Sequence, residues 1–379
     1  MQRMPEKLLD DAVALTRRLV RLDSQNAANQ ACEDGVCECL ARYFAEQGLA
    51  CVRQEAAGGR RNLLVSPEAA ACRSKGSAAA PRMLIIGHMD TVVVGAMKDP
   101  LGGQLREGRI FGRGACDDKG PLAAAAATVA VFARSGAAGA WNLTFAATAD
   151  EEGGMRGARA LARTIGSFDL CIALEPTRGR VVTAHKGVCR AVLVTRGRAG
   201  HSSQPDKGPN AIEAMLPLCT ALMEYSRELS AVEDARLGRS TLTMTQFHAG
   251  AAPNVIPDRC ELVVDIRLLP ECEPAEIERR LRGICGQSAQ LHSLLSCRGI
   301  RSDPEGPVIR AFRQAVADEG GDATPMAVHY CTDCSQLAHL GPCAVWGPGD
   351  IAQAHGDEEF IEVAQIESAC RTLWRFLHG

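Results

Sequence analysis

The chain has 379 residues, of which 46% are hydrophobic and 23% charged, and its formal net charge at pH 7 is -3. This composition is that of an ordinary globular protein, and the length favours two domains over one. The near-neutral charge and the aromatic content of only 4% argue against a nucleic-acid partner, which would favour a basic surface and stacking rings.

Three further features bear on location. The segment after Met1 is charged and periodic, and no apolar signal-peptide core follows it. The longest apolar candidate, 121–133, is short and rich in alanine, which predicts a buried helix rather than a membrane span. The 17 cysteines are scattered over a long chain, unlike the disulfide framework of a small secreted domain. We therefore predict a cytoplasmic protein with reduced thiols and no membrane partner.

The first part of the chain alternates predicted helices and strands. Apolar spacing predicts amphipathic helices over 6–22 and 31–47. A short strand over 62–65 and a polar surface loop over 66–82 follow. Three apolar runs then predict buried strands over 83–87, 143–148 and 170–174.

Polar residues stand directly after each of these three buried strands. His88 and Asp90 follow the first, Glu151 and Glu152 follow the second, and Glu175 follows the third. In open α/β sheets, ligands bind beyond the carboxyl ends of the strands. The repeated order of strand, polar cluster and helix therefore predicts an α/β fold, a doubly wound, mostly parallel sheet with its polar residues at one edge.

From about Lys186 the pattern changes to strand, helix, strand, strand, helix, strand. The predicted elements are 188–196, 210–229, 241–248, 261–268, 274–285 and 289–296. This order predicts a ferredoxin-like unit inserted into the α/β layer. We expect a first domain that comprises 1–186 and 299–379, with the insert over 187–298 and a closing helix over 364–377.

Two cysteine clusters allow several interpretations. Cys331 and Cys334 form a C-x-x-C pair, and Cys32, Cys37 and Cys39 form a second group. A zinc knuckle would need a matched second pair, and a redox motif would need a thioredoxin-like context. Neither context is evident in the sequence.

The strand ends supply residues that bind divalent metals. Carboxylates and imidazoles suit borderline ions, zinc first. Crowded carboxylates would repel one another, and two ions about 3.5–4 Å apart could share one carboxylate and one water, which then ionises near neutral pH. Of two adjacent glutamates, one could ligate while its neighbour acts as the base. Any one of these residues could instead cap a helix or lie in a solvated loop. That interpretation is unlikely for the whole set, which gathers at the ends of predicted strands together with two histidines. The set is His88, Asp117, Glu151, Glu152, Glu175 and His355.

Five motifs give this pattern a family resemblance. They are Gly-His-Met-Asp-Thr-Val at 87–92, the stretch 112–120, Asp-Glu-Glu-Gly at 150–153, Leu-Glu-Pro-Thr at 174–177 and Ala-His at 354–355. In this order they resemble the co-catalytic zinc amidohydrolase and exopeptidase family, which includes acetylornithine deacetylase, succinyl-diaminopimelate desuccinylase, aminoacylase and glutamate carboxypeptidase. The resemblance spans nearly the whole chain.

The resemblance implies a site with two zinc ions, for which cobalt or manganese could substitute. Asp117 would bridge the ions and precede a cis peptide bond. Asp90 would orient a histidine ligand through its other ring nitrogen, and Glu151 would be the general base. The remaining ligands would be His88 and Glu175 for one ion, and Glu152 and His355 for the other.

The resemblance also implies that the insert is a lid and dimerisation domain, and that the chain forms a homodimer. His201, in Gly-His-Ser-Ser, matches the motif whose histidine reaches the partner subunit's site, where it would stabilise the oxyanion. A plain turn residue is the alternative. Asn254 and Arg267 match lid positions that meet the substrate.

Several segments are most similar to acetylornithine deacetylase. Lys186 could hold a substrate carboxylate as a point charge, and Thr332 would lie in a pocket loop with the C-x-x-C cysteines as mere neighbours. Two residues depart from that enzyme: Asp333 stands where it usually has a glutamate, and Asp118 is an additional aspartate. The stretches 117–121 and 150–154 are more similar to the carboxypeptidase and dipeptidase branch of the family. Resemblance to either branch implies hydrolysis of an amide bond in a small molecule.

We predict metal-dependent hydrolysis of an N-acyl amino acid, with N-acetylornithine as the leading substrate. Because a few contacts set the specificity of a pocket, a dipeptidase or carboxypeptidase and a succinyl-diaminopimelate desuccinylase are alternatives within the family. An inactive dimeric binding relative is the alternative outside enzymes.

Overall fold

The computed structural model describes residues 3–27, 30–66, 80–135 and 140–379. The chain folds into two compact units. Unit 1 comprises Met1–Thr183, Ser302–Met326 and Thr332–Gly379, and unit 2 comprises Ala184–Arg301 and Ala327–Cys331. Unit 2 is thus an insertion in the sequence of unit 1, and the predicted insert over 187–298 falls inside it.

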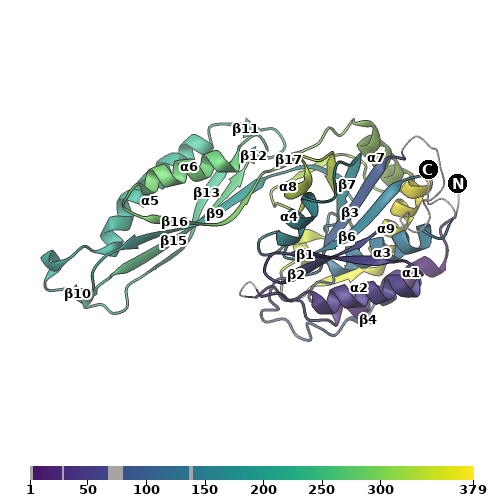
Figure 1. Ribbon diagram of the computed structural model, residues 1–379, viewed down its shortest axis with the longest axis horizontal. Helices are drawn as coiled ribbons and strands as arrows, with labels where there is room; N and C mark the ends of the chain where they lie inside the picture. Colours follow the sequence, from purple (N-terminus) through teal and green to yellow (C-terminus); the bar gives the residue numbers. More distant parts are fainter. Residues whose placement is uncertain (1–2, 28–29, 67–79, 136–139) are drawn as a thin grey trace. The chain divides into compact units, whose positions relative to one another are not determined.

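One mixed sheet of nine strands contains the predicted parallel strands (Figure 1). Its order is β1-β2-β6-β3-β7-β19-β8-β17, and β18 pairs with β8. Four neighbouring strands run parallel. They are β6 (Asn142–Thr148), β3 (Arg82–His88), β7 (Leu170–Ala173) and β19 (Cys343–Val345).

The flanks of this sheet are antiparallel, so the prediction of a mostly parallel sheet is wrong there. At one edge β1 (Cys51–Ala56) and β2 (Arg60–Val65) form a hairpin with a three-residue connection, which can join only antiparallel strands. The strands at the other edge are β8 (Val182–His185), β17 (Ile300–Arg301) and β18 (Met326–Val328).

Helices cover both faces of the sheet, as a doubly wound fold requires. Neighbouring residues of β7 point to opposite faces of the sheet. Ile172 belongs to the main core on one face, and Cys171 lies near Cys334 of α8 (Cys334–Leu337) on the other. The face of Ile172 packs under α3 (Lys119–Phe132), a helix buried along almost its whole length. The other helices of unit 1 are α1 (Lys7–Val20), α2 (Asp34–Glu46), α4 (Arg156–Ala162), α7 (Pro307–Asp318) and α9 (Val363–His378).

A small antiparallel sheet also belongs to unit 1 and borders the site described below. Its order is β20-β5-β4, with β4 (Gln104–Arg106), β5 (Arg109–Phe111) and β20 (Phe360–Glu362). The sequence did not predict these short strands. The predicted loop over 66–82 lies mostly outside the described residues.

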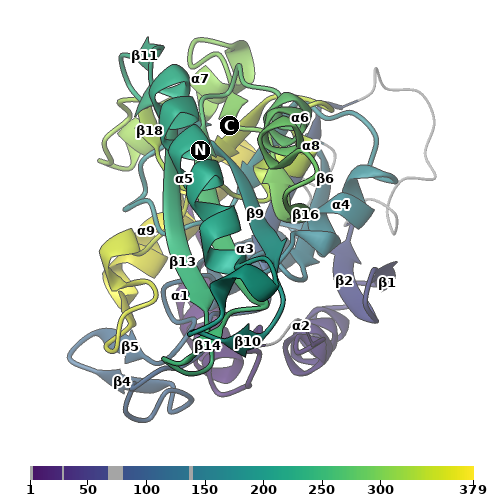
Figure 2. The ribbon, with the colours of Figure 1, turned by 90° about the vertical axis from the view of Figure 1, so that its left-hand side faces the viewer.

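Unit 2 follows the predicted order of elements. Its four-stranded sheet has the order β13-β15-β9-β16, and every neighbouring pair is antiparallel. Figure 2 shows α5 and α6 side by side over one face of this sheet. The elements are β9 (Gly187–Arg196), α5 (Ala211–Leu229), β13 (Thr241–Ala249), β15 (Arg259–Leu268), α6 (Pro274–Cys285) and β16 (Gln290–Cys297), with short pairs β10 (Gly200–His201) with β14 (Val255–Ile256) and β11 (Glu233–Asp234) with β12 (Gly238–Arg239).

Alternation along β15 explains how this sheet forms. Leu262, Val264 and Ile266 are fully buried under the helices, whereas the intervening residues are partly exposed. Asn210 caps α5, because its side chain accepts hydrogen bonds from the backbone of Ile212 and Glu213.

Within the described parts of both units, no helix is long and apolar enough to cross a membrane.

Candidate metal centre

The predicted metal ligands of unit 1 meet at one edge of its sheet. The strands β6, β3 and β7 are neighbours and run parallel, so their carboxyl ends lie together. His88 is the last residue of β3, and Glu152 and Glu175 follow β6 and β7. Asp117 comes from the turn before α3, and His355 follows the short helical turn Ile351–Gln353.

These residues form two donor groups that share one aspartate. His88, Asp117 and Glu175 form the first group, and Asp117, Glu152 and His355 form the second. Within each group, one donor atom per residue lies within 4.8 Å of the others. The two groups together offer two imidazoles and three carboxylates, the ligand types that zinc, cobalt and manganese accept.

The two oxygens of Asp117 face different groups. Its Oδ1 lies 3.0 Å from His88 Nε2, and its Oδ2 lies 3.2 Å from His355 Nε2. His355 Nε2 is also 3.0 Å from Glu152 Oε1. This is the arrangement that a carboxylate bridging two ions needs. The Asp117–Asp118 peptide bond is cis, as the family resemblance implied.

The acids of the centre are crowded and poorly solvated. Burial and the charge of Asp117 raise the pKa of Glu175 well above its ordinary value. Burial also raises the pKa of Glu151, and the charge of Glu152 adds to this effect. Hydrogen bonds to Asp117 and Glu152 raise the pKa of His355 to about 10. The pKa of Asp117 is lowered instead, because both histidines form hydrogen bonds to it. Divalent cations bound here would offset the repulsion among the crowded carboxylates.

Asp90 contacts both a predicted ligand and the segment of the predicted base. The ring nitrogen Nδ1 of His88 lies 2.9 Å from the backbone oxygen of Asp90 and 3.6 Å from Asp90 Oδ1. The Asp90 carboxylate also accepts the backbone N–H groups of Glu151 at 3.0 Å and Glu152 at 3.2 Å. Asp90 therefore holds the segment that contains the predicted base.

Glu151 and Glu152 differ in their contacts. Glu152 bonds to His355, whereas no hydrogen bond to the Glu151 carboxylate is found among the residues that the structure describes.

Asp118 and Asp333, the two departures from the acetylornithine deacetylase pattern, are also in this centre. Asp118 Oδ2 accepts the backbone N–H of His88 at 3.2 Å, and Asp333 Oδ2 accepts a hydrogen bond of 2.7 Å from Thr148.

Gly87 explains why a glycine precedes the histidine ligand. A Cβ atom at this position would lie 2.5 Å from Asp118 Oδ2 and 2.9 Å from a methyl group of Leu174. Only glycine lets the Asp118 carboxylate approach the end of β3. Burial and the charge of Asp117 raise the pKa of Asp118, while the charge of His88 lowers it, and the net shift is upward.

Glu359 is a site residue that the sequence did not reveal. It is buried and accepts the backbone N–H groups of Cys116 at 2.9 Å and Asp117 at 3.0 Å. It also pairs with the buried Arg113 at 2.7 Å. Glu359 follows Asp357 and Glu358 in an acidic run, and nothing in the run marks which carboxylate faces inward.

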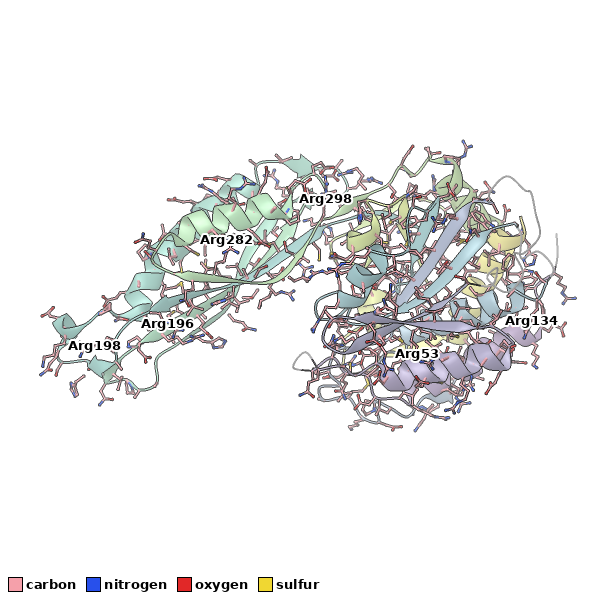
Figure 3. All side chains as sticks on the ribbon, viewed as in Figure 1. Arg53, Arg134, Arg196, Arg198, Arg282 and Arg298 are labelled. Atoms are coloured by element: carbon pink, nitrogen blue, oxygen red, sulfur yellow. The ribbon has the colours of Figure 1, made fainter. Side chains whose placement is uncertain are left out.

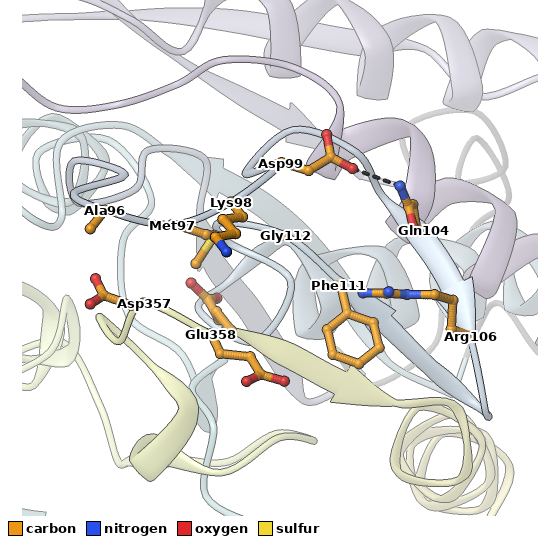
Figure 4. A pocket seen from close by; sticks show the side chains of 11 residues that line it. Ala96, Met97, Lys98, Asp99, Gln104, Arg106, Phe111, Gly112, Asp357 and Glu358 are labelled. Atoms are coloured by element: carbon orange, nitrogen blue, oxygen red, sulfur yellow. Dashed lines mark hydrogen bonds between the residues drawn. The ribbon is translucent and has the colours of Figure 1, made fainter.

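A pocket of about 390 Å³ lies beside this acidic run (Figure 4). Lys98, Asp357 and Glu358 line it, and the guanidinium of Arg106 lies over the ring of Phe111, 4.5 Å from its centroid. None of the five donor residues lines this pocket. It is therefore distinct from the metal centre, although Glu359 belongs to its wall.

Unit 2 contains three of the predicted substrate residues and the predicted oxyanion residue His201. Lys186 is buried, and its Nζ donates a hydrogen bond of 2.5 Å to the backbone oxygen of Arg239. Arg267 pairs with Asp265 at 2.7 Å. His201 and Asn254 belong to one small region, because β10 pairs with β14 and the backbone oxygen of Asn254 accepts the N–H of Ser202.

His201 is exposed and lies 2.7 Å from Ser203 Oγ through its Nδ1. A pocket of about 140 Å³ around it is also lined by Arg198 and Lys207. These cationic neighbours favour an anionic group beside His201. In unit 1, Thr332 is buried and its Oγ1 accepts the N–H of Cys334.

Cys334 of the C-x-x-C pair belongs to a cluster of three buried cysteines. Cys334 Sγ lies within 4.8 Å of the sulfur atoms of Cys171 and Cys343, which face it from two neighbouring strands. All three side chains are buried in the core of unit 1. The Cys334 thiol is thus placed by core packing, next to the loop of Thr332.

Comparison with known proteins defines the class. Residues 84–379 match the model of Peptidase family M20/M25/M40. Because this match covers well over half of the 379 residues, the chain belongs to that family of metal-dependent hydrolases, as the motifs predicted.

Two relatives with a named activity add to this assignment. The chain is 33% identical over 301 residues to an acetylornithine deacetylase of Myxococcus xanthus, which covers 75% of this chain and 76% of that protein. It is 29% identical over 389 residues to an acetylornithine deacetylase of Aliivibrio salmonicida (strain LFI1238), over 96% of each.

Solved structures support the fold. An M20 family metallo-carboxypeptidase from Sulfolobus solfataricus has a TM-score of 0.79 at 16% identity, over 97% of this chain and 99% of that one. A dinuclear metal binding peptidase of the M20 family from Bacillus subtilis has a TM-score of 0.66 at 15% identity, over 99% and 98%.

Proposed function

We propose that this chain hydrolyses the amide bond of an N-acyl amino acid at a two-metal centre, with N-acetylornithine as its leading substrate. One observation supports the reaction class above all others: two donor groups meet at Asp117, whose two oxygens face different groups. The relatives named acetylornithine deacetylase support the substrate.

The donor groups name the residues that would hold the ions. His88, Asp117 and Glu175 would hold one ion, and Asp117, Glu152 and His355 the other. Zinc is the first expectation, with cobalt or manganese as substitutes. When bound, such ions polarise the amide carbonyl and make a shared water more acidic.

The protein's own groups would divide the rest of the work. Glu151 would take the proton of the attacking water and pass it to the leaving amine. Its backbone N–H is fixed by Asp90, and its carboxylate is not among the donors of either group. Because the Glu151 carboxylate belongs to neither donor group, it is available to accept a proton.

Unit 2 would act as a ferredoxin-like lid and dimerisation domain. The strand order β13-β15-β9-β16 and the two helices on one face support this fold. The edge strand β13 exposes Phe247 and Met244, and α5 exposes Leu216 and Met223. An edge strand with exposed apolar residues is suited to pairing with a second copy.

Substrate contacts would come from unit 2. His201 of the partner subunit would stabilise the oxyanion, and Asn254 and Arg267 would meet the substrate. Lys186 could hold the substrate carboxylate only if its ammonium shares or leaves the bond to Arg239. A cytoplasmic location, where thiols stay reduced, fits the 17 cysteines.

A dipeptidase or carboxypeptidase is the second candidate. Asp118 favours it, because this additional aspartate departs from the acetylornithine deacetylase pattern and resembles the dipeptidase and carboxypeptidase branch. Its carboxylate lies in the centre, where it accepts the backbone N–H of His88. Both candidates use the same two donor groups and the same base, so they differ only in the pocket that receives the substrate.

A substrate panel on enzyme reconstituted with zinc, cobalt or manganese tests the proposal. The panel comprises N-acetyl derivatives of ornithine, citrulline, glutamate and methionine, N-succinyl-diaminopimelate and several dipeptides. We expect the highest kcat/KM with N-acetylornithine and loss of activity after chelation. A preference for dipeptides would select the second candidate. No turnover by protein shown to hold two ions would overturn the proposal and favour an inactive binding relative.

A further inference from the structure

A buried arginine from the N-terminal part of the chain reaches toward the metal centre. Arg60 is the first residue of β2, and its side chain is fully buried. It precedes residues 84–379, the part that matches the family model. A buried guanidinium is costly unless several acceptors surround it.

Arg60 has four oxygen-bearing partners, and its Nη1 also lies 3.9 Å from Cys32 Sγ. It forms an ion pair with the buried Glu33. Its Nη2 donates to the backbone oxygen of Gln30 at 2.6 Å and to Asn26 Oδ1 at 2.9 Å. The same nitrogen lies 3.4 Å from Asp150 Oδ1. The bond from Arg60 fixes which end of the Asn26 amide is the oxygen.

Asn26 connects this arginine to two carboxylates of the centre. Its Nδ2 donates to Asp90 Oδ2 at 2.7 Å and to Asp150 Oδ1 at 2.9 Å. Both hydrogens of the amide and its oxygen are therefore used. Asn26 cannot turn without breaking contacts on both sides.

The two carboxylates in turn flank the segment with the proposed base. Asp90 accepts the backbone N–H groups of Glu151 and Glu152. Asp150 precedes this pair in a left-handed conformation, with φ of 71°, and also binds Arg156 at 2.6 Å. A continuous chain of contacts thus runs from Arg60 through Asn26 to the base and one ligand.

We propose that Asn26 and Arg60 are positioning residues that hold Asp90 and Asp150 in the orientation that places Glu151 and Glu152. This inference rests on the proposed function. It predicts an unequal effect on the two donor groups. The Asp90 carboxylate bonds directly to the backbone of Glu152, which belongs to the group of His355. Its contact with His88, in the other group, is longer at 3.6 Å.

Asn26→Ala is the main test, because it removes the connecting amide without leaving a new buried charge. We expect kcat and the affinity for the second ion each to fall about 10- to 100-fold, as for other residues that orient ligands. The affinity for the first ion falls less than that for the second, and KM stays within about two-fold. Stepwise cobalt titration, followed by visible absorption, measures both affinities without relying on turnover.

Arg60→Met and Arg60→Lys form a second pair. The methionine variant is expected to reproduce the asymmetric loss, and the lysine variant to restore part of it, since lysine keeps the charge but not the fork of donors. Arg53→Met is the matched control. Arg53 lies on the surface in β1 (Figure 3), where it bonds to Glu38 at 2.8 Å, and its loss leaves kcat and both affinities unchanged.

The outcomes separate this inference from the proposed function. A folded Asn26→Ala protein with wild-type kcat and both ion affinities intact would overturn the inference, and so would an equal loss at both ions. If Arg60→Met does not fold, the measurements on Asn26→Ala still test the inference. If the wild-type protein hydrolyses nothing in the substrate panel but Asn26→Ala weakens the second ion more than the first, the proposed reaction fails and the positioning role stands.

Discussion

The two units place their charged residues in opposite ways. At the sheet edge of unit 1, Asp90, Asp117, Glu175 and Glu359 are each no more than 6% exposed. In unit 2, ion pairs such as Arg280–Glu228 lie at the surface, with side chains 53% and 58% exposed. Lys186 is the exception among the described charged residues of unit 2, since it is buried.

This difference has an energetic meaning. Exposed ion pairs contribute about 0–1 kcal/mol each, so the surface pairs of unit 2 have little influence on stability. Buried carboxylates are costly unless hydrogen bonds or cations compensate them. Unit 1 retains them where the donor atoms converge, which indicates that chemistry rather than stability accounts for their placement.

The largest expected effect is on catalysis by the proposed base. Glu151→Ala should lower kcat about 10²- to 10⁴-fold, the usual contribution of a general base. Metal content should not change, because Glu151 belongs to neither donor group. Steady-state kinetics and atomic spectroscopy measure the two quantities. Glu358→Ala, which removes a nearby exposed carboxylate, is the control. Equal turnover by both variants would contradict the assignment of Glu151 as the general base.

The next effect is on stability. Glu359→Ala leaves the buried Arg113 without its ion pair and two backbone N–H groups without an acceptor. We expect the free energy of unfolding to fall by about 3–5 kcal/mol, the cost of breaking a buried pair. Denaturant unfolding measures it, and a loss below that of a surface pair would contradict the contrast between the two units.

A smaller effect is expected from unit 2. His201→Ala should lower kcat about 10²- to 10³-fold, as does removal of one oxyanion donor. Metal content and the unfolding midpoint should be unchanged, since His201 is exposed. Ser203→Ala, which removes the hydroxyl 2.7 Å from His201, should have a weaker effect. If His201→Ala keeps the wild-type kcat, the proposed role in stabilising the oxyanion is wrong and His201 is an ordinary turn residue.

The smallest effect tests the surface charges of unit 2. Glu228→Ala removes the exposed partner of Arg280. The free energy of unfolding should change by less than about 1 kcal/mol, with kcat unchanged. A loss as large as that of Glu359→Ala would show that exposure does not separate the two classes of charge.

The sequence predicted the parallel strands and the residues after them for a clear reason. Parallel strands buried on both faces need continuous apolar runs, and such runs stand out at 83–87, 143–148 and 170–174. The strands that escaped prediction are short or half exposed. β19 has three residues, and β1 is partly or fully exposed along its length.

Site residues outside the motifs were missed for a different reason. Asn26, Arg60 and Glu359 act through contacts with residues far away in the sequence. Local composition does not show which polar side chain turns inward. The contact of Lys186 with Arg239 is of the same kind, so the sequence could propose its role but not its partner.

The number of metal ions per chain tests the central claim most directly. Protein saturated with zinc and freed of loosely bound metal can be analysed by atomic spectroscopy, beside His355→Ala. We predict two ions in the wild-type chain and one in the variant, because the group of His88, Asp117 and Glu175 stays complete. One ion in the wild-type chain, or two in His355→Ala, would contradict a centre in which Asp117 joins two donor groups.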